Sequence, residues 1–287
     1  MSVGTDSVGI RTLYVSDLDG TLLDRSGGLA EGCRTGLNEL LAGGLEFTVA
    51  SARSVFSMQQ ILGDLPLNLP VVSFNGAFIS DLATGVHEVV NAIDRDVADE
   101  IFDALPRFGC VPFLSTFDGK EDRVYYDSVI NDGMRWYLED RFLKKDRRWR
   151  KVGDMRSRLR EQLVCITLIA REEELADLHR HLLERYPDNI EMHFQENMYS
   201  PGWHWLTIHD HRATKARGID TLRTVRNLRD HRLVVFGDHL NDLKMFQSAD
   251  HAIAVANAVE ELRNHAHEVI GSHDEGSVVE YLKRIEN

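Results

Sequence analysis

Short apolar segments alternate with amphipathic helical segments at both ends of this 287-residue chain. Near the N-terminus, strands are predicted at RTLYVSD (11–17), LEFTVAS (45–51) and VVSFNG (71–76), and the residues between them are apolar at helical spacing. The pattern returns near the C-terminus, with predicted strands at RLVVFGD (232–238) and HAIAVANA (251–258). Buried strands separated by helices form a parallel sheet, so both ends predict an α/β fold.

The middle of the chain has a different pattern. Predicted helices there mix with strands of alternating polarity, such as RVYYDSV (123–129) and NIEMHFQ (189–195). We therefore predict an α+β domain inserted at residues 83–203 into a parallel-sheet core of residues 1–82 and 204–287. The insertion begins and ends in one region between the domains, as a hinged lid requires.

Composition argues against several classes of protein. The chain carries 46 acidic and 33 basic residues, and its formal net charge of −13 disfavours general nucleic-acid binding. No apolar run approaches the ~20 residues that a membrane-spanning helix needs, and the N-terminus lacks the pattern of a secretory signal. We expect a cytoplasmic protein without a membrane partner. The three cysteines form no CxxC pair, so we expect buried thiols and no disulfide framework.

The segment YVSDLDGTLLD (14–24) places two carboxylates where the first predicted strand ends. In an open parallel sheet, ligands bind outside the carboxyl ends of the strands. Side chains at i and i+2 of a strand share a face, so Asp17 and Asp19 can both point into such a cleft. Gly20 lets the backbone turn and bring N–H groups close to an anion.

Two carboxylates at one strand end suit phosphoryl transfer. An aspartate is ionised at pH 7, so Asp17 can attack phosphorus directly and form an aspartyl phosphate. Asp19 can then protonate the leaving oxygen and deprotonate the water that hydrolyses the intermediate. Both carboxylates repel a phosphate dianion, so this scheme needs Mg²⁺, a cation that prefers oxygen ligands.

The same scheme requires further polar groups at other strand ends. VVFGDHLND (234–242) supplies Asp238, Asn241 and Asp242, and Lys215 begins a predicted helix. In VASAR (49–53), Ser51 and the N–H of Ala52 can bind a phosphate oxygen beside a helix N-terminus. Taken singly, these residues also suit helix caps or a solvated lysine, and their joint occurrence favours the phosphate site.

The motifs resemble those of the haloacid dehalogenase superfamily, and specifically of its Cof-like phosphatases with a type IIB cap. The segments that carry the resemblance are DLDGTLL (17–23), ASAR (50–53), Lys215, GDHLND (237–242), SFNGAFISD (73–81) and AVANAVEELR (254–263). The resemblance spans both ends of the chain and, through the size and place of the insertion, the middle. It implies a Rossmann-like core and an α+β cap that selects the substrate.

The resemblance also implies roles for individual residues. Asp17 is implied to be the nucleophile and Asp19 the acid/base. Mg²⁺ is implied to be held by Asp17, the Asp19 carbonyl and Asp238, with Asp242 supporting or joining the metal ligands. Phosphate is implied to bind Ser51 and Lys215, with Asn241 near it. The N–H groups at Gly20 and Ala52, named above from the backbone argument, complete the expected phosphate site.

Three positions depart from the family pattern. Ala52 stands where the second motif usually has Gly, and it adds a Cβ where the backbone approaches phosphate. DHRATK (210–215) replaces the usual Pro-x-Gly-Val-Ser-Lys, and Thr207 stands where many relatives have Glu. These departures concern loop shape and substrate choice rather than the phosphoryl chemistry.

Three features in the insertion or directly after it lie outside this scheme. KKDRRWRKVGDMRSRLR (144–160) has nine basic and two acidic residues, which favours a solvated surface over an anion-attracting patch. The histidines of HWLTIHDHR (204–212) match no standard metal-site spacing. Trp203 and Trp205 alternate at strand spacing, which favours packing in a core over a stacking platform.

The leading functional hypothesis is a Mg²⁺-dependent phosphatase that hydrolyses a small phosphorylated metabolite, such as a sugar phosphate, nucleotide or phosphorylated cofactor. One alternative is a phosphomutase of the phosphomannomutase type, which returns the phosphoryl group to a sugar. Another is a binding protein without turnover, although such a protein has no need of a second carboxylate at Asp19. The sequence leaves the substrate and the oligomeric state open.

Overall fold

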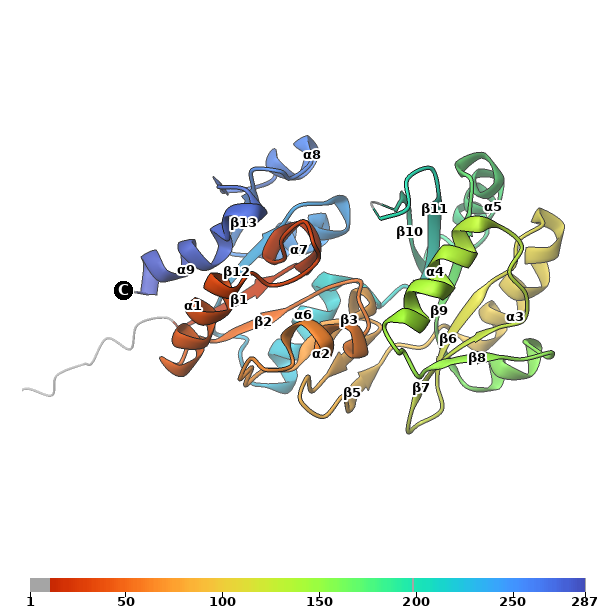
Figure 1. The fold of residues 1–287 in the computed structure, drawn as a ribbon, viewed down its shortest axis with the longest axis horizontal. Coiled ribbons are helices and arrows are strands. Elements are labelled where there is room, and N and C mark those ends of the chain that lie inside the picture. Colours follow the sequence, from red (N-terminus) through yellow and green to blue (C-terminus); the bar gives the residue numbers. More distant parts are fainter. Residues whose placement is uncertain (1–10, 198, 287) are drawn as a thin grey trace, which may run out of the picture. The chain divides into compact units, whose positions relative to one another are not determined.

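The computed structural model describes residues 11–197 and 199–286. The chain forms two compact units, and each is a separate fold with its own sheet (Figure 1). The first unit runs to Glu88 and resumes at Thr214, and the second is Val89–Ala213. The chain therefore leaves the first unit once and returns to it once.

A parallel five-stranded sheet forms the centre of the first unit. Its strands, in spatial order, are β14 (Glu268–Ile270), β13 (His251–Val255), β12 (Arg232–Gly237), β1 (Thr12–Ser16) and β2 (Phe47–Val49). Beyond β2, a parallel bridge from Ala50 to Val72 leads to a small sheet of β3 (Val71–Ser73), β4 (Phe78–Ser80) and β5 (His87–Val90). The prediction of an α/β fold with a parallel sheet is confirmed.

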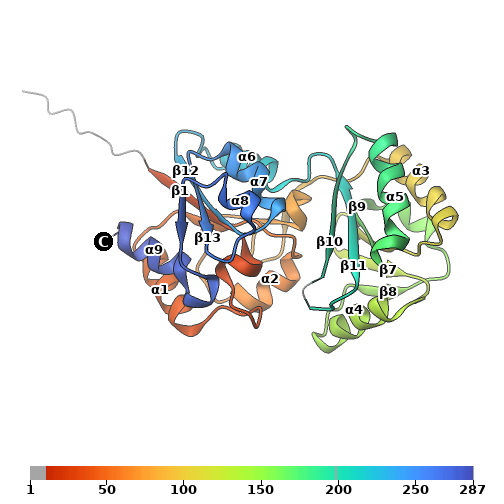
Figure 2. The same cartoon turned by 90° about the horizontal axis from the view of Figure 1, so that it is seen from above.

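Helices cover both faces of this sheet, which explains why its central strands are apolar throughout. Figure 2 shows α1 and α9 on one face and α6 and α7 on the other. The helices of this unit are α1 (Glu31–Ala42), α2 (Val55–Leu62), α6 (Lys215–Val225), α7 (Leu243–Ser248), α8 (Glu260–Arg263) and α9 (Ser277–Glu286). Leu13, Val15, Val235 and Phe236 on the central strands are fully buried.

The second unit is an α+β fold around a six-stranded sheet. Its strands, in spatial order, are β10 (Ile190–Glu196), β11 (His204–Asp210), β9 (Gln162–Ala170), β6 (Phe113–Phe117), β7 (Asp122–Tyr126) and β8 (Trp149–Lys151). The pairings are antiparallel except for β7 with β8. Its helices are α3 (Arg95–Ala104), α4 (Asp132–Leu143) and α5 (Glu172–Arg185). Within the described part of the chain, no helix is both long and apolar enough to cross a membrane.

The boundary between the units differs from the predicted boundary of 83–203. Strand β11 pairs with β9 and β10 along its length, so His204–Asp210 belongs to the sheet of the second unit. The sequence pattern alone could not assign this strand, because its alternating residues suit either sheet. The chain crosses back to the first unit only at Thr214, directly before α6.

Trp203, Trp205 and the three cysteines have identifiable surroundings. Trp203 and Trp205 pack against a cluster that contains Phe113 and Trp149, which confirms the prediction of core packing. Cys165 is buried, but Cys33 and Cys110 are only partly buried, so the expectation of three buried thiols is wrong for two of them. Each of these two lies near the edge of its unit's core, on α1 and after α3, rather than in a central strand.

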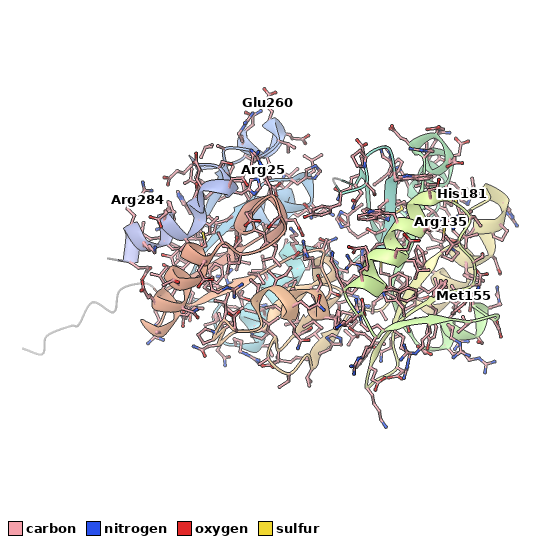
Figure 3. All side chains as sticks on the ribbon, in the orientation of Figure 1. Arg25, Arg135, Met155, His181, Glu260 and Arg284 are labelled. Atoms are coloured by element: carbon pink, nitrogen blue, oxygen red, sulfur yellow. The ribbon has the colours of Figure 1, made fainter. Side chains whose placement is uncertain are left out.

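The basic segment 144–160 is partly neutralised within the second unit. Arg148 is paired with the buried carboxylate of Asp146 at 2.7 Å, and Arg156 forms an ion pair with Asp103. Other long cationic side chains of this unit, such as Arg135 on α4, extend from its surface (Figure 3).

His209 in β11 is buried, and burial lowers its pKa to about 4, so its ring is neutral at pH 7.

Substitution of two glycines in the first unit can test how tightly the turn at Gly76 packs against Thr214. Gly76 and Gly44 have similar φ angles, +104° and +95°. A Cβ at Gly76 would overlap the carbonyl oxygen of Thr214, whereas at Gly44 it would meet no described atom within 4 Å. Gly44→Ala should lower the free energy of unfolding by about 1–2 kcal/mol, for the unfavourable φ alone. Gly76→Ala should lower it by about 1–3 kcal/mol more, because backbone must move.

Urea denaturation of the two variants beside the unchanged protein measures this difference. Equal losses of stability in Gly76→Ala and Gly44→Ala would contradict the close approach of the two loops at Gly76.

Candidate active site

Asp17 lies directly after β1, at the carboxyl end of the central parallel strands. Its N–H donates to the carbonyl of Phe236 at the end of β12, at 3.0 Å, which ties the two strand ends together. Its side chain is buried, and Oδ1 lies 2.7 Å from Nζ of Lys215. Lys215 is the first residue of α6, which begins after the N-cap Thr214. The helix start therefore places a lysine against the first carboxylate.

Lys215 joins two buried carboxylates. Its Nζ lies 2.7 Å from Oδ1 of Asp17 and 2.6 Å from Oδ1 of Asp242, and the lysine itself is 1% exposed. The other oxygen of Asp242 accepts the N–H groups of Asp238 and His239, at 3.0 and 3.1 Å. Both oxygens of Asp242 are thus engaged, so this residue holds the lysine and the turn after β12 in place.

Asp238 completes an acidic cluster. Its Oδ1 accepts the hydroxyl of Thr21 at 3.0 Å, and a Cβ at Gly20 would overlap its Oδ2. One oxygen from each of Asp17, Asp238 and Asp242 lies within 4.8 Å of the others, and this is the one such group among the described residues. Three carboxylates around one lysine leave an excess of negative charge. Carboxylate oxygens are the ligands that Mg²⁺ prefers, so the cluster fits that cation.

The pKa values of the cluster show the cost of burying these charges. Burial raises the pKa of Asp17 well above its usual range, although Lys215 opposes the shift. Burial and the neighbouring Asp242 raise the pKa of Asp238 to about 6. Burial works against the charge of Lys215, but Asp17 and Asp242 outweigh it and raise the pKa of the lysine. The lysine therefore stays charged, and the carboxylates lack sufficient positive charge nearby.

Asp19 occupies a different position from the one the strand pattern predicts. Strand β1 ends at Ser16, and Asp19 lies in the turn Leu18–Leu22 with non-helical backbone angles. Its side chain therefore does not share a strand face with Asp17. It instead forms a two-pronged ion pair with Arg53, with N–O distances of 2.7 and 2.5 Å. The prediction that both carboxylates extend from the strand itself is wrong, because strand β1 ends at Ser16, before either aspartate.

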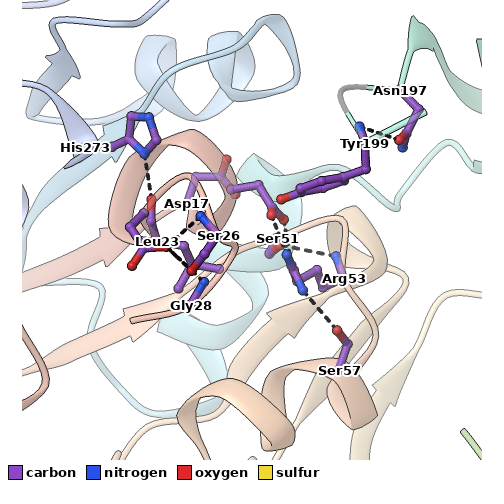
Figure 4. Close-up of polar contacts among 12 residues, drawn as sticks. Asp17, Leu23, Ser26, Gly28, Ser51, Arg53, Ser57, Asn197, Tyr199 and His273 are labelled. Carbon is purple, nitrogen blue, oxygen red and sulfur yellow. Dashed lines mark hydrogen bonds and ion pairs between the residues drawn. The ribbon is translucent and has the colours of Figure 1, made fainter. Parts of the chain in front are cut away.

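Arg53 is a contact residue that the sequence analysis did not single out. Its guanidinium also donates to Ser57 Oγ at 3.2 Å, and its N–H donates to Ser51 Oγ at 3.2 Å (Figure 4). Arg53 belongs to the ASAR segment, and its place in that motif was the one sign in the sequence that it could have a role. Its partner Asp19 is 34 residues away in sequence, so spacing could not reveal the pair.

The remaining predicted phosphate-binding residues follow neighbouring strands. Ser51 is buried directly after β2, and Ala52 beside it is exposed. The helix that follows, α2, begins at Val55 after the N-cap Ser54. Asn241 is half-buried in the turn after β12, with its Nδ2 3.5 Å from Oδ1 of the buried Asn75. The fold thus brings the end of β2 and the turn after β12 to the same edge of the sheet as Asp17, because β1 lies between β2 and β12.

The chain thus combines a parallel α/β core that has carboxylates at its central strand ends with an inserted α+β unit. The sequence pattern of the haloacid dehalogenase-like hydrolases matches residues 14–282. The chain belongs to this family, and the resemblance stated from the motifs is confirmed.

Individual relatives support the assignment over the full length. Two curated proteins of Bacillus subtilis strain 168 are named 5-amino-6-(5-phospho-D-ribitylamino)uracil phosphatase. YitU is 23% identical over 274 residues, covering 94% of this chain and 96% of YitU, and YwtE is 24% identical over 288 residues, covering 94% and 96%. The crystal structure of TM0651 from Thermotoga maritima superposes with a TM-score of 0.78 at 24% identity, over 97% of this chain and 98% of that one. The fold is thus shared across both units.

The buried lysine generates a prediction about stability. Lys215→Met should lower the free energy of unfolding at pH 7 by about 3–5 kcal/mol, because it leaves Asp17 and Asp242 buried without their cation. Lys244→Met, at an exposed position on α7, should change it by less than about 0.5 kcal/mol. Chemical denaturation without added metal compares the two. A similar small effect for both variants would contradict the central role of the lysine.

Proposed function

We propose that this hydrolase is a Mg²⁺-dependent phosphatase that releases phosphate from a small phosphomonoester through an aspartyl phosphate on Asp17. The observation that carries the proposal is the contact of Asp17 with Lys215 inside the acidic cluster. A nucleophilic carboxylate for a phosphate dianion needs positive charge beside it, and here one lysine contacts it directly. Asp17, Asp238 and the Asp19 carbonyl would hold Mg²⁺, which when bound offsets the negative charge of carboxylates and phosphate.

The residues of this chain divide the reaction between them. In the first step an oxygen of Asp17 attacks phosphorus, the bond from phosphorus to the ester oxygen breaks, and Asp19 donates a proton to that oxygen. In the second step water attacks the aspartyl phosphate, Asp19 accepts the proton of the water, and the carboxylate of Asp17 is restored as phosphate leaves. Ser51, Lys215 and Asn241, with N–H groups at Gly20 and Ala52, would bind the phosphate oxygens.

The pairing of Asp19 with Arg53 bears on its proposed role as the acid/base through the position of the carboxylate alone. A group that alternates between acid and base has to be held in one place while its proton moves. The two-pronged contact with Arg53 restrains the carboxylate of Asp19, and Ser57 restrains Arg53 in turn. Asp17 and Asp19 thus have different partners, Lys215 and Arg53, which suits two different roles.

We further propose that the second unit, Val89–Ala213, is the cap that selects the substrate. YitU and YwtE are named for a substrate in which a phosphorylated ribityl chain is joined to a uracil ring. An open-chain polyol phosphate attached to a heterocycle is therefore the first substrate class to examine for this chain. Identity of 23–24% to these relatives supports the phosphoryl chemistry more strongly than it supports the substrate.

The first experiment measures phosphate release from an aryl phosphate and a panel of sugar phosphates, nucleotides, cofactor phosphates and the phosphoribitylaminouracil. Asp17→Asn should reduce turnover by at least about a thousandfold, because an amide is not a nucleophile here. Removal of Mg²⁺ with a chelator should reduce it to a similar extent. Asp64→Asn, at an exposed aspartate paired with Arg34, is the control and should retain full activity.

Phosphate release that persists in Asp17→Asn would contradict the aspartyl phosphate. Interconversion of sugar phosphates without release of phosphate would favour the phosphomutase alternative instead.

A second experiment tests the metal without turnover. Mg²⁺ at about 100 times its dissociation constant should stabilise the folded protein by about 2.7 kcal/mol and raise the midpoint of thermal unfolding. Asp238→Asn should abolish this shift. The same variant without metal should be at least as stable as the unchanged protein, because burial and Asp242 disfavour the charged form of Asp238. An equal Mg²⁺ shift in both proteins would place the metal elsewhere.

A further inference from the structure

The loop that follows Asp17 and carries Asp19 is held from outside by residues near the C-terminus. Nδ2 of Asn257 donates to the carbonyl of Gly20 at 2.8 Å. Nδ1 of His273 lies 2.7 Å from the carbonyl oxygen of Leu23 (Figure 4). Both contacts join segments more than two hundred residues apart in the chain. The residues Leu18–Leu23 are called the aspartate loop below.

The two outside residues are themselves connected. Oδ1 of Asn257 accepts the backbone N–H of His273 at 3.0 Å. A carbonyl oxygen can only accept, so the contact with Leu23 requires the proton of the His273 ring to lie on Nδ1. The next residue, Asp274, accepts the N–H of Arg25 at 3.1 Å and forms an ion pair with its side chain. These three residues therefore form one connected group, called the clamp below, that holds residues 20–25.

The aspartate loop depends on such contacts because it lacks regular structure of its own. Asp19 and Gly20 have non-helical backbone angles within it, and a backbone hydrogen bond from Leu23 N–H to the Leu18 carbonyl spans it. The carbonyl and N–H of one peptide unit point in opposite directions. When Asn257 binds the carbonyl of Gly20, it therefore sets the direction of the Thr21 N–H as well.

We infer that Asn257 and His273 are positioning residues that set the orientation of the aspartate loop, and with it the placement of Asp19 and Thr21. Neither residue contacts the acidic cluster through a hydrogen bond that the structure records, so each acts through the backbone of the loop. Thr21 in turn donates to Asp238, and Arg53 restrains Asp19 from the other side. This inference rests on the proposed function, because it assigns the two residues a part in the turnover of Asp17 and Asp19.

The variants are chosen to separate the hydrogen bond from the volume of the side chain. His273→Asn keeps a donor near the position of Nδ1, whereas His273→Asp places an acceptor against the carbonyl of Leu23. Asn257→Asp likewise keeps the acceptor for His273 N–H and removes the donor to Gly20. His265→Asp is the matched control, since Nδ1 of His265 also contacts a backbone carbonyl, that of Glu261, but at an exposed site away from the loop.

The first readout is turnover of an aryl phosphate. His273→Asp and Asn257→Asp should lower kcat by about 10- to 100-fold with KM changed by less than about threefold, because misplaced groups impair the reaction more than binding. His273→Asn and His265→Asp should retain kcat within about threefold. Unchanged kcat in both His273→Asp and Asn257→Asp would overturn the inference, and so would an equal loss in His273→Asn and His273→Asp.

The second readout does not require turnover. Amide hydrogen exchange of the peptide that contains residues 18–25 should be at least about tenfold faster in His273→Asp and Asn257→Asp than in the unchanged protein and in His273→Asn. Unchanged exchange would overturn the clamp. If the unchanged protein releases no phosphate from any substrate, the proposed function fails, and exchange still decides whether the clamp orders the loop.

Discussion

The contact of one buried ammonium group with two buried carboxylates organises this site. Lys215 is 1% exposed and lies within 2.7 Å of both Asp17 and Asp242, so none of the three charges is hydrated as in water. Each member would be costly to bury alone, and removal of the lysine leaves both carboxylates without compensation. This constraint explains why the start of α6, the end of β1 and the turn after β12 have to meet with little freedom.

The order of the strands makes that meeting possible. In the sequence, Asp17, Ser51, Lys215 and Asp238 are separated by up to some two hundred residues, and a complete second unit lies between two of them. Strand β1 is central, with β12 on one side and β2 on the other, and the three are parallel. Their carboxyl ends therefore lie at one edge, where each following turn contributes its first polar residues. A parallel sheet thus converts distant segments into one site without any long loop.

The sequence alone was enough to predict those parts of the structure that patterns of neighbouring residues determine. Periodicity predicted the parallel core, and the position of polar residues at strand ends and at a helix start predicted that Asp17, Asp238 and Lys215 would approach one another. The sequence did not predict which residues or strands pair with one another across the sheet. The pairing of Asp19 with Arg53 depends on where strand β1 ends, and the assignment of β11 depends on which strands it meets. Both are decided by tertiary packing, which residue spacing does not encode.

The difference between the partners of the two aspartates follows from the same packing and bears on function. If Asp19 had continued strand β1, it would have lain beside Asp17 in the cluster and added a fourth carboxylate to a group that is already short of positive charge. The backbone instead leaves strand geometry after Ser16, and the carboxylate of Asp19 contacts Arg53, whose guanidinium is charged at any pH at which the protein is folded. Lys215 contacts Asp17 and Asp242, while Asp19 keeps a separate partner. The end of the strand at Ser16 therefore gives the two aspartates different cationic partners, although only one residue lies between them.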